Sequence, residues 1–404
     1  MNVGWSSRRL ESLCEFFNDG NWIESKDQSD SGYRLIQTGN VGIGEFRNKS
    51  GKERFVSEET FKKLKCTEIF PGDTLISRLP DPVGRTCILP PLNERMITAV
   101  DCTIVRFKKN VMISDYFRYY SQSVSYFQDV SKKITGTTRD RISRSNLGSI
   151  EITFPEDLAE QQRIVSILDE AFAAIDKAKA NIEKNISNAR ELFQSELNAV
   201  FSQMGEGWVE KRLNEISENL DSKRIPITKS LREPGEYPYY GASGIVDYVK
   251  NYIFDDNLLL VSEDGANLLA RTYPIAFSIS GKTWVNNHAH ILKFQSLITQ
   301  SFVEFYLNSI RLNPFVSGMA QPKLNQAMLN KIPIPYPNLE LQEKIVMKLN
   351  TLSTNVRQLE FLYRNKLDQL DILRKSILHK AFNGELTKGI VADEALQEKT
   401  TLSK

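Results

Sequence analysis

The chain has 404 residues, of which 41% are hydrophobic and 25% are charged, so it is long enough for two globular domains with connecting elements. It contains no apolar run near the ~20 residues that cross a bilayer, and no apolar signal region follows residues 1–10, so we expect a protein of the cytoplasm. The formal net charge is only +2, so any binding to a polyanion must come from local basic clusters.

The four cysteines all lie in the first half of the chain and form no close pair. This spacing indicates neither a zinc ligand set nor a disulfide framework. We therefore expect reduced, mostly buried thiols at Cys14, Cys66, Cys87 and Cys102.

Residues 1–155 mix short β-rich runs with helical stretches. Runs of apolar and β-branched residues predict strands at residues 73–77 and at Cys102–Phe107. Aromatic residues gather near the end of this region, at Tyr116-Phe117 and at Tyr119-Tyr120. We interpret them as part of a hydrophobic core rather than as stacking surfaces.

A long helix is predicted over residues 156–205. Asp157 is available as its N-cap, with Glu160 three residues further on to complete a capping box, and Gly205 and Gly207 end the pattern. Apolar residues then recur at spacings of three, four or seven, which indicates one continuous stripe. The stripe consists of Ile164, Leu168, Phe172, Ile175, Ile182, Ile186, Ala189, Phe193, Leu197 and Val200.

The second half has the same organisation. Residues 206–337 contain β-rich runs at Leu258–Ser262 and at residues 290–294, and then aromatics at Phe302 and Phe305-Tyr306. A second helix is predicted over residues 338–384, capped by Asn338, with a 3.5-residue period broken only at Lys366. Residues 385–404 are expected to be a flexible tail. The second stripe consists of Ile345, Leu349, Leu352, Val356, Leu359, Tyr363, Leu370, Leu373 and Ile377.

These parallels amount to an internal duplication. The offset between the matching segments is 203 at the start of each half and 181 in the helices, so the second globular region is shorter. Chance similarity between amphipathic helices is the alternative, but the matching segments outside the helices argue against it. Gly4-Trp5 and Arg9-Leu10 match Gly207-Trp208 and Arg212-Leu213; Leu147, Ile150, Ile152, Phe154 and Pro155 match Leu329, Ile332, Ile334, Tyr336 and Pro337; and Gln161, Ile164 and Val165 match Gln342, Ile345 and Val346.

Each predicted helix is on the order of 60 Å long at ~1.5 Å per residue, which is too long for the interior of one domain. We expect the two helices to pair with one another, although two ordinary core helices are the alternative. The predicted fold class is α+β, with two similar α/β domains at 1–155 and 206–337. A long helix follows each domain, and the helices pair as an antiparallel coiled coil with pseudo-two-fold symmetry.

Modest basic clusters mark candidate contacts with nucleic acid. A polar loop precedes each helix, and it carries Arg139 in the first half and Gln321 in the second. Arginine and glutamine can make bidentate contacts with guanine and adenine edges. A charge run is usually just a solvated face, so each residue is only a candidate. The candidates are Arg47, Lys49, Lys132, Lys133, Arg139, Arg141, Arg144, Lys223, Arg224, Lys282, Trp284, His288, Gln321 and Lys323.

Three partial matches to catalytic or ligand motifs are rejected. Gly281-Lys282-Thr283 lacks the upstream glycine of a phosphate-binding loop. His288-Ala289-His290 could ligate a metal only with a third ligand from elsewhere. Asn313-Pro314-Phe315 lacks the second proline of the adenine methyltransferase tetrapeptide, and no glycine-rich cofactor loop precedes it. We therefore predict no catalytic residue and no metal site.

The order of these parts resembles the specificity subunits of Type I restriction-modification systems. In both halves Ile-x-Ile-x-aromatic-Pro leads into a helix that begins near Gln161 or Gln342. The segment from Lys380 to Leu386 is similar to a conserved region of that family, and Trp284 to Leu292 is similar to a common core of its reading domains. The resemblance covers almost the whole chain.

The resemblance implies a non-catalytic subunit that reads an asymmetric, two-part site on double-stranded DNA. It also implies two methylation subunits that use S-adenosylmethionine and, for cleavage, two restriction subunits that use ATP and Mg²⁺; no cofactor is expected on this chain. The alternatives are a bivalent scaffold that binds proteins and an autonomous adenine methyltransferase. The target sequence and the gap between its halves do not follow from the residues.

Overall fold

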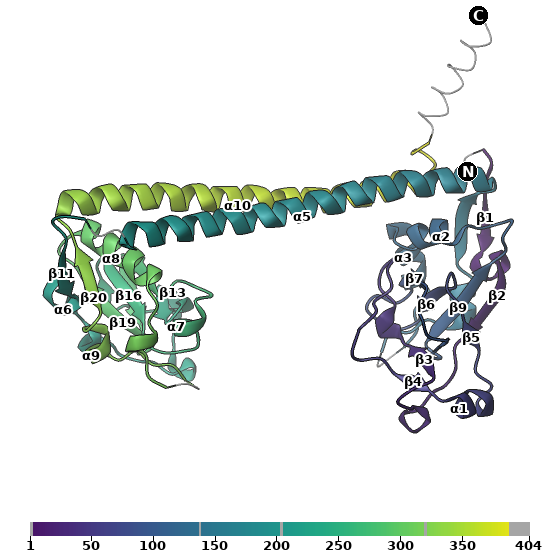
Figure 1. Cartoon of the computed structure of the whole chain (residues 1–404), viewed down its shortest axis with the longest axis horizontal. Coiled ribbons are helices and arrows are strands. Elements are labelled where there is room, and N and C mark those ends of the chain that lie inside the picture. The colour runs from purple at the N-terminus through teal and green to yellow at the C-terminus, as the bar shows by residue number, and fades with distance from the viewer. Residues whose placement is uncertain (1–2, 137–138, 203–204, 319–320, 388–404) are drawn as a thin grey trace, which may run out of the picture. The chain divides into compact units, whose positions relative to one another are not determined.

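The computed structural model describes residues 3–136, 139–202, 205–318 and 321–387. The chain forms two compact units, the first from residues 1–181 and 366–404 and the second from residues 182–365. Each unit contains a sheet-bearing domain and parts of two long helices (Figure 1), which confirms the mixed helix and sheet class. None of the described helices combines the length and apolar character needed to cross a membrane.

The first domain contains a two-stranded ribbon, β1-β10, and two four-stranded sheets in the orders β2-β9-β6-β7 and β4-β3-β8-β5. In the second of these sheets β3 and β8 run parallel, and the other neighbours are antiparallel. The strands are β1 (Trp5–Arg9), β2 (Cys14–Asp19), β3 (Tyr33–Ile36), β4 (Phe55–Val56), β5 (Glu68–Ile69), β6 (Thr74–Ser77), β7 (Thr86–Ile88), β8 (Met96–Thr98), β9 (Cys102–Phe107) and β10 (Glu151–Pro155).

The second domain repeats this topology strand for strand. Its ribbon is β11-β20, and its sheets have the orders β12-β19-β16-β17 and β14-β13-β18-β15, which are the orders of the first domain with ten added to each number. The internal duplication predicted from the sequence is therefore confirmed. The strands are β11 (Val209–Arg212), β12 (Glu218–Asn219), β13 (Pro234–Gly241), β14 (Gly244–Val249), β15 (Phe254–Asp255), β16 (Leu258–Ser262), β17 (Ala276–Ile279), β18 (Lys282–Val285), β19 (Ala289–Lys293) and β20 (Pro333–Tyr336).

Shorter helices complete each domain. In the first domain they include α1 (Glu58–Lys63), α2 (Ser114–Tyr120), α3 (Val124–Ser131) and α4 (Arg144–Gly148). In the second they are α6 (Leu213–Ile216), α7 (Asn267–Ala270), α8 (Leu297–Ser309) and α9 (Gln326–Leu329). The four cysteines are free and buried in the first domain, as expected.

The repeated sequence segments meet within each domain. The opening segment forms β1 and pairs with β10, the strand that leads into the first long helix, and β11 pairs with β20 in the same way. Leu10 and Leu213, the last residues of the repeated openings, are both completely buried. The residues that reveal the duplication thus lie where the first strand of each domain pairs with its last strand.

A buried glutamine fixes the start of each long helix. The Gln161 side chain accepts a hydrogen bond from the Ile113 amide (2.9 Å) and donates to the Val111 and Pro155 carbonyls (both 2.9 Å). Gln342 donates to the Pro337 carbonyl (2.9 Å) and accepts from the Thr299 hydroxyl (2.8 Å). Both side chains are fully buried, and each would leave unpaired polar groups in the core if it were lost.

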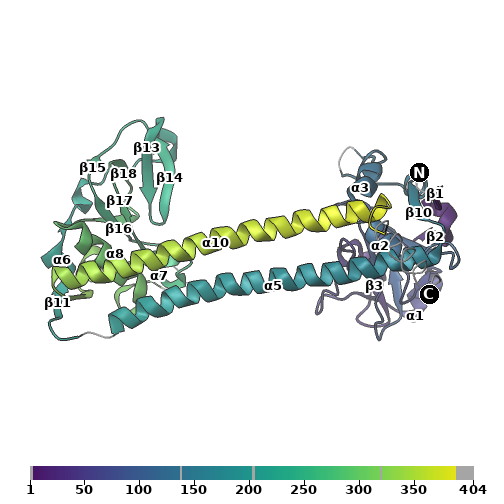
Figure 2. The ribbon, with the colours of Figure 1, turned by 90° about the horizontal axis from the view of Figure 1, so that it is seen from above.

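The two long helices are α5 (Leu158–Ser202) and α10 (Leu339–Phe382) (Figure 2). The Asp157 carboxylate accepts from the Ala159 amide (2.9 Å), and the Asn338 side chain accepts from the Leu341 amide (2.9 Å), so both predicted caps are present. Glu160 accepts a hydrogen bond from the Thr387 hydroxyl rather than closing the predicted capping box.

Ion pairs show that α5 and α10 are antiparallel inside each unit. In the first unit Asp176 pairs with Arg374 (2.9 Å) and Lys179 pairs with Asp371. In the second unit Arg190 pairs with Glu360 (2.7 Å) and Glu196 pairs with Lys348. In both units residue numbers rise along one helix as they fall along its partner, which is the predicted direction of pairing.

The ends of the helical stripes belong to the domain cores. Ile164, Leu168, Phe172 and Ile175 pack into the first domain's core together with Leu378. Leu197 joins the second domain's core, which also contains Ile345, Val346 and Leu349. Contacts between α5 and α10 therefore bury only part of each stripe, whereas the apolar pattern predicts that the whole stripe pairs with the other helix. The remaining predicted pairing residues are partly exposed, with Val356 buried: Ile182, Ile186, Phe193, Leu352, Tyr363, Leu370 and Ile377.

The row of α10 residues that faces α5, called the seam below, differs from the predicted apolar stripe. At every second stripe position from Leu359 onward, the residue that faces α5 is the next one along the chain. Leu359 is 41% exposed and Leu373 is 46% exposed, whereas Glu360 and Arg374 are turned toward α5 and form ion pairs with it. A 3.6-residue helix drifts relative to a strict 3.5-residue repeat, so the seam moves one residue along. Leu367 then faces inward in place of Lys366, which explains the apparent break in the sequence pattern.

The aromatic residues of α2 and α8 are core residues, as predicted. Tyr116, Phe117 and Phe302 are completely buried. Phe382 at the end of α10 contacts the Tyr116 ring (centroids 5.5 Å apart), and Phe201 at the end of α5 contacts the Phe302 ring (5.4 Å). Each domain therefore anchors the C-terminal end of one long helix through an aromatic edge contact.

One position breaks the equivalence of the two units. In the first unit Phe172 lies against the Tyr119 ring (5.4 Å) and beneath the Arg374 guanidinium (4.0 Å). The matching residue of α10, at an offset of 181, is Ser353. Ser353 lines a cleft of about 360 Å³ in the second unit, together with Phe193 and Phe305, which match Arg374 and Tyr119.

We predict that Phe172→Ala lowers the free energy of unfolding of the first unit by about 3–5 kcal/mol, because a buried ring is removed from a filled site. Ser353→Ala is the matched control and should change stability little, because its surroundings are already open. Hydrogen exchange of the α2 and α8 amides under mild denaturant measures each unit separately. Equal effects of the two substitutions would contradict the structural difference between the sites.

Candidate nucleic-acid interface

Each domain has a tight hairpin loop shortly before α4 or α9. In the first domain Thr135 and Arg141 exchange two backbone hydrogen bonds (2.8 and 3.0 Å). In the second, Ser317 and Lys323 do the same (2.9 and 2.8 Å). The predicted polar loops are therefore closed in the same way, and the segments 135–141 and 317–323 are called hairpins below. Residues 137–138 and 319–320 lie outside the described part of the chain.

A glycine sets the backbone of both hairpins. Gly136 has a φ of +139° and Gly318 a φ of +82°, values that favour glycine. A Cβ atom at Gly136 would lie 2.2 Å from the Arg139 carbonyl oxygen, and one at Gly318 would lie 2.6 Å from that of Gln321. Any larger residue at these positions would force the loop apart. The hairpins thus share both their hydrogen bonds and their glycine.

The hairpins are attached to equivalent sheet strands. The Ile142 amide, just after the first hairpin, donates to the Arg78 carbonyl at the end of β6 (3.2 Å). The Leu324 amide donates to the Glu263 carbonyl at the end of β16 (2.8 Å). Because β6 and β16 are inner strands of their sheets, each hairpin is attached to a rigid part of its domain.

Beneath the first hairpin lies a buried arginine. Arg78 is 4% exposed, pairs with Asp19 (3.2 Å) and donates to the Val100 carbonyl (2.6 Å). Arg141, at the base of the hairpin, pairs with Asp101 (3.1 Å). Neither Arg78 nor Asp19 was predicted, because the two residues are far apart in the sequence and match no motif.

Beneath the second hairpin lies a cluster built on His290. The ring is 1% exposed, with Nδ1 against the Asp221 carboxylate and Nε2 at 2.8 Å from the Leu324 carbonyl oxygen. Glu263 completes the cluster by pairing with Arg224 (2.6 Å) and with Lys323 at the hairpin base (3.3 Å). The same place in the two domains is therefore held by different charged residues.

Hydrogen bonds and charge outweigh burial at Asp221. Burial raises the pKa of this carboxyl, but the hydrogen bonds from His290 and the Ile291 amide, with the charges of His290 and Arg224, bring the pKa below its ordinary value. Burial and neighbouring cations act in the same opposing way on Glu263, and its pKa is also lowered. The folded domain therefore favours both groups as carboxylates.

Asp221, Glu263 and His290 are also residue types that bind metals, and their ligand atoms lie within 4.8 Å of one another. Arg224 and Lys323 pair with Glu263, Arg224 also pairs with Asp221, and His290 Nε2 faces a carbonyl oxygen. A cation here would have to displace these partners. The donor set therefore fits an internal ion network better than a metal site.

The predicted basic residues of the first domain differ in their surroundings. Three are engaged by neighbours, with Lys132 paired to Asp129, Lys133 donating to Ser149 and Arg144 donating to Asn18. Arg47 pairs with Glu45 in the segment between β3 and β4, where Lys49 is exposed. Arg139 is exposed on the hairpin. The structure thus brings Arg139 and Arg141 together and places Arg47 and Lys49 on a different segment.

In the second domain the predicted residues form two groups. The first is near the hairpin: Gln321 is exposed, and His288 pairs with Asp264 (2.8 Å), whose backbone bridges to Lys323. The second group lies on and near β18, where the Lys282 ammonium faces the Tyr252 ring (4.9 Å) and Trp284 donates to the Ile225 carbonyl (2.7 Å). Lys223 is exposed, whereas Arg224 belongs to the His290 cluster.

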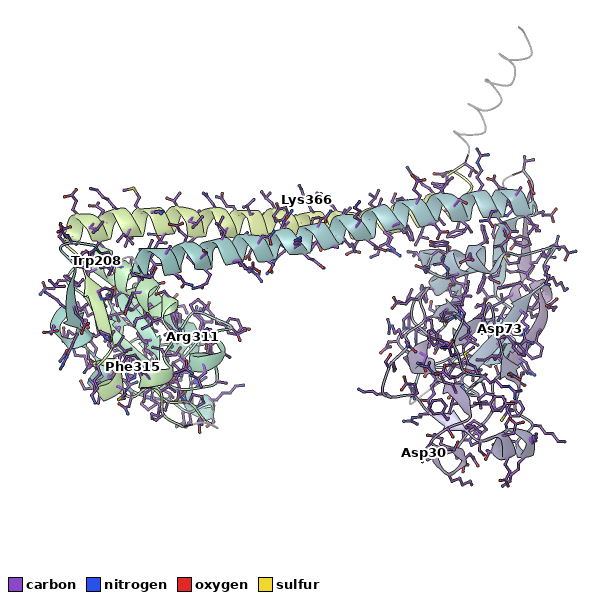
Figure 3. All side chains as sticks on the ribbon, viewed as in Figure 1. Asp30, Asp73, Trp208, Arg311, Phe315 and Lys366 are labelled. Carbon is purple, nitrogen blue, oxygen red and sulfur yellow. The ribbon has the colours of Figure 1, made fainter. Side chains whose placement is uncertain are left out.

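The Asn313-Pro314-Phe315 segment forms a short 3₁₀ turn after α8. Figure 3 shows Phe315 on the second domain, away from the long helices. Its ring packs against the domain's hydrophobic core. This turn therefore has a packing role in the described structure.

We predict that Asp221→Asn lowers the stability of the second domain by about 1–3 kcal/mol at neutral pH, because it removes the buried carboxylate that faces His290 and pairs with Arg224. Since the pKa of Asp221 is lower in the folded state, its stabilisation is complete above the ordinary carboxyl pKa and is lost as the pH falls through the folded value.

The acid-induced loss of stability should accordingly be smaller in the Asp221→Asn variant. Hydrogen exchange of the β16 and β19 amides as a function of pH measures it, with Asp255→Asn as the control, because Asp255 is an exposed carboxylate of the same domain. A variant with unchanged protection and an unchanged pH profile would contradict this account of the cluster.

Known proteins whose sequences are similar to this chain belong to one family. A putative type I restriction enzyme specificity subunit of Haemophilus influenzae is 38% identical over 143 residues, which are 35% of this chain and 37% of that protein. A putative type I specificity subunit of Mycoplasma genitalium is 24% identical over 410 residues and covers 96% of this chain and 97% of its own length. The specificity subunit of the type I restriction enzyme EcoDI of Escherichia coli is 24% identical, over 63% of this chain and 68% of that protein.

Solved structures share the fold. A chain from a study of complex assembly and conformational transition in the type I R-M system superposes with a TM-score of 0.77 at 15% identity, over 96% of this chain and 99% of that one. The HsdS subunit of Thermoanaerobacter tengcongensis gives a TM-score of 0.59 at 17% identity, over 96% and 98%. The family model of the Type I restriction modification DNA specificity domain matches twice, at residues 2–188 and 205–366. The chain therefore belongs to the family of Type I restriction-modification DNA specificity domains, of which it contains two.

Proposed function

We propose that this chain is the DNA-recognition subunit of a Type I restriction-modification complex and reads a two-part, asymmetric target. The observation that carries the proposal is the duplicated domain. Both copies have the same strand order, and their hairpins are closed by the same backbone hydrogen bonds, but the two copies present different side chains. Two similar domains with different surfaces suit a site made of two different half-sites, each read by one domain.

The two long helices are proposed to set the gap between the half-sites. Each is one uninterrupted element of more than 40 residues, and α5 connects one domain directly to the next. Consecutive DNA turns lie about 34 Å apart along one face of the duplex, well within the ~1.5 Å per residue that such helices span. The length of α5 and α10 would then determine the number of unread base pairs.

The exposed apolar residues of the helices are proposed to dock the methylation subunits. In the second unit Leu192 (59% exposed) and Met347 (64% exposed) line a shallow groove with Leu352. In the first unit Ile372 is 65% exposed. Large apolar side chains exposed together typically mark protein interfaces.

The chain itself is proposed to be non-catalytic and to bind no cofactor. Two methylation subunits would supply S-adenosylmethionine chemistry at adenine, and two restriction subunits would supply ATP- and Mg²⁺-dependent cleavage. The turn at residues 313–315 packs on the core of its domain, which disfavours an autonomous methyltransferase built around it. The repeated match to a DNA specificity domain disfavours a purely protein-binding scaffold.

The test is to map methylated adenines in cells that express this chain with its methylation partner. We expect one bipartite asymmetric motif, and we expect the purified complex to bind that motif with strong salt dependence. The purified chain alone should transfer no labelled methyl group to DNA. Methylation by the chain alone, or a complex without salt-dependent DNA affinity, would overturn the proposal.

A second test changes the spacing. Inserting four residues after Asn185, which lengthens α5 by about one turn or ~6 Å, should lengthen the gap in the methylated motif and leave both half-sites unchanged. The same methylation map measures it. As a control, four residues inserted after Gly51, in the exposed segment between β3 and β4, should leave the gap unchanged. A gap that does not respond to the α5 insertion would exclude the helices as the spacing element.

A further inference from the structure

The two hairpins present one equivalent side chain each. Arg139 and Gln321 both stand three residues after the hairpin glycine, at an offset of 182 that also relates Gly136 to Gly318. Both side chains are exposed, and neither makes a hydrogen bond or an ion pair with any described residue. They differ in this from Arg141 and Lys323 at the hairpin bases, which pair with carboxylates of their own domains.

The described residues that hold these two side chains make equivalent backbone contacts in the two domains. Each hairpin is closed by two backbone hydrogen bonds and attached by a third to the end of an inner strand. Below it, a buried arginine or a buried histidine is held by carboxylates. Attachment to an inner strand is the kind of support that a side chain needs in order to read a base edge.

We infer that Arg139 and Gln321 are specificity-determining residues that occupy the same reading position in the two domains. Arginine donates two hydrogen bonds to O6 and N7 of guanine, and glutamine pairs with N6 and N7 of adenine. The inference rests on the proposed function. It assigns a guanine at one position of the first domain's half-site and an adenine at the matching position of the second domain's half-site.

The experiment exchanges the two side chains in the full complex with the methylation subunit. Arg139→Gln should replace guanine by adenine at one position of the first half-site, with methylation of the original site reduced about 5- to 100-fold. Gln321→Arg should make the reverse change in the second half-site only. Arg139→Lys keeps the charge but loses the planar fork, so it should relax the preference at that position with little loss of overall affinity.

Lys109→Gln serves as the charge-matched control, because Lys109 is an exposed residue of the same domain in the turn after β9. Its motif should be that of the unaltered protein. Thermal melting checks that all variants fold.

Two results would overturn the inference. A uniform loss of affinity for all sequences in Arg139→Gln, with a smaller salt dependence and an unchanged motif, would identify a phosphate contact instead. An unchanged motif with unchanged affinity would exclude Arg139 from the interface. The proposed function fails separately, if the unaltered complex methylates no bipartite motif at all.

Discussion

A long amphipathic helix has an apolar stripe that is removed from water only where it packs on another element, and this constraint decides how the chain is built. The start and the end of each stripe are covered by domain cores, through residues such as Leu168 and Phe201. Part of the remainder faces the other helix, and ion pairs such as Asp176–Arg374 and Arg190–Glu360 join the two helices there. Because each helix begins on one domain and ends in the other unit, neither domain is complete without a helix that started elsewhere in the chain.

The buried polar groups of the two domains show how a shared frame can tolerate different sequences. Gln161 and Gln342 do the same task with the same residue type, since each satisfies backbone groups where a strand turns into a helix. The charged groups beneath the hairpins do the same task with different residues, Arg78 with Asp19 in one domain and His290 with Asp221 in the other. Their geometry matters more than their identity, provided that every buried charge has a partner.

Much of the fold followed from local patterns in the sequence. The strands Cys102–Phe107 and Leu258–Ser262 have the predicted bounds, and the caps at Asp157 and Asn338 are present. The duplication could be recognised in the sequence because the repeated segments form the paired first and last strands of each domain. The seam of α10 was misplaced at alternate positions, since a sequence stripe records apolar residues and does not record the drift that turns Glu360 rather than Leu359 inward.

The candidate site was harder to predict than the fold. Arg139 and Gln321 were predicted as candidates because a loop with a glycine precedes each helix, but the charged residues that support the loops come from separate strands and match no motif. Arg224 was predicted as a nucleic-acid contact, whereas its guanidinium is occupied by Glu263 and Asp221, and a basic residue in a sequence does not reveal such a partner.

The cleft beside Ser353 makes the duplicated halves unequal in a way that strand order does not reveal. Where Phe172 packs against Tyr119 of α2 in the first unit, the second unit has a cleft lined by Ser353 of α10 and Phe305 of α8. The same pair of elements is therefore filled by a ring in the first unit and left open to solvent in the second. Two domains with one strand order therefore offer different surfaces where a long helix meets its domain, a closed one in the first unit and a hollow one in the second.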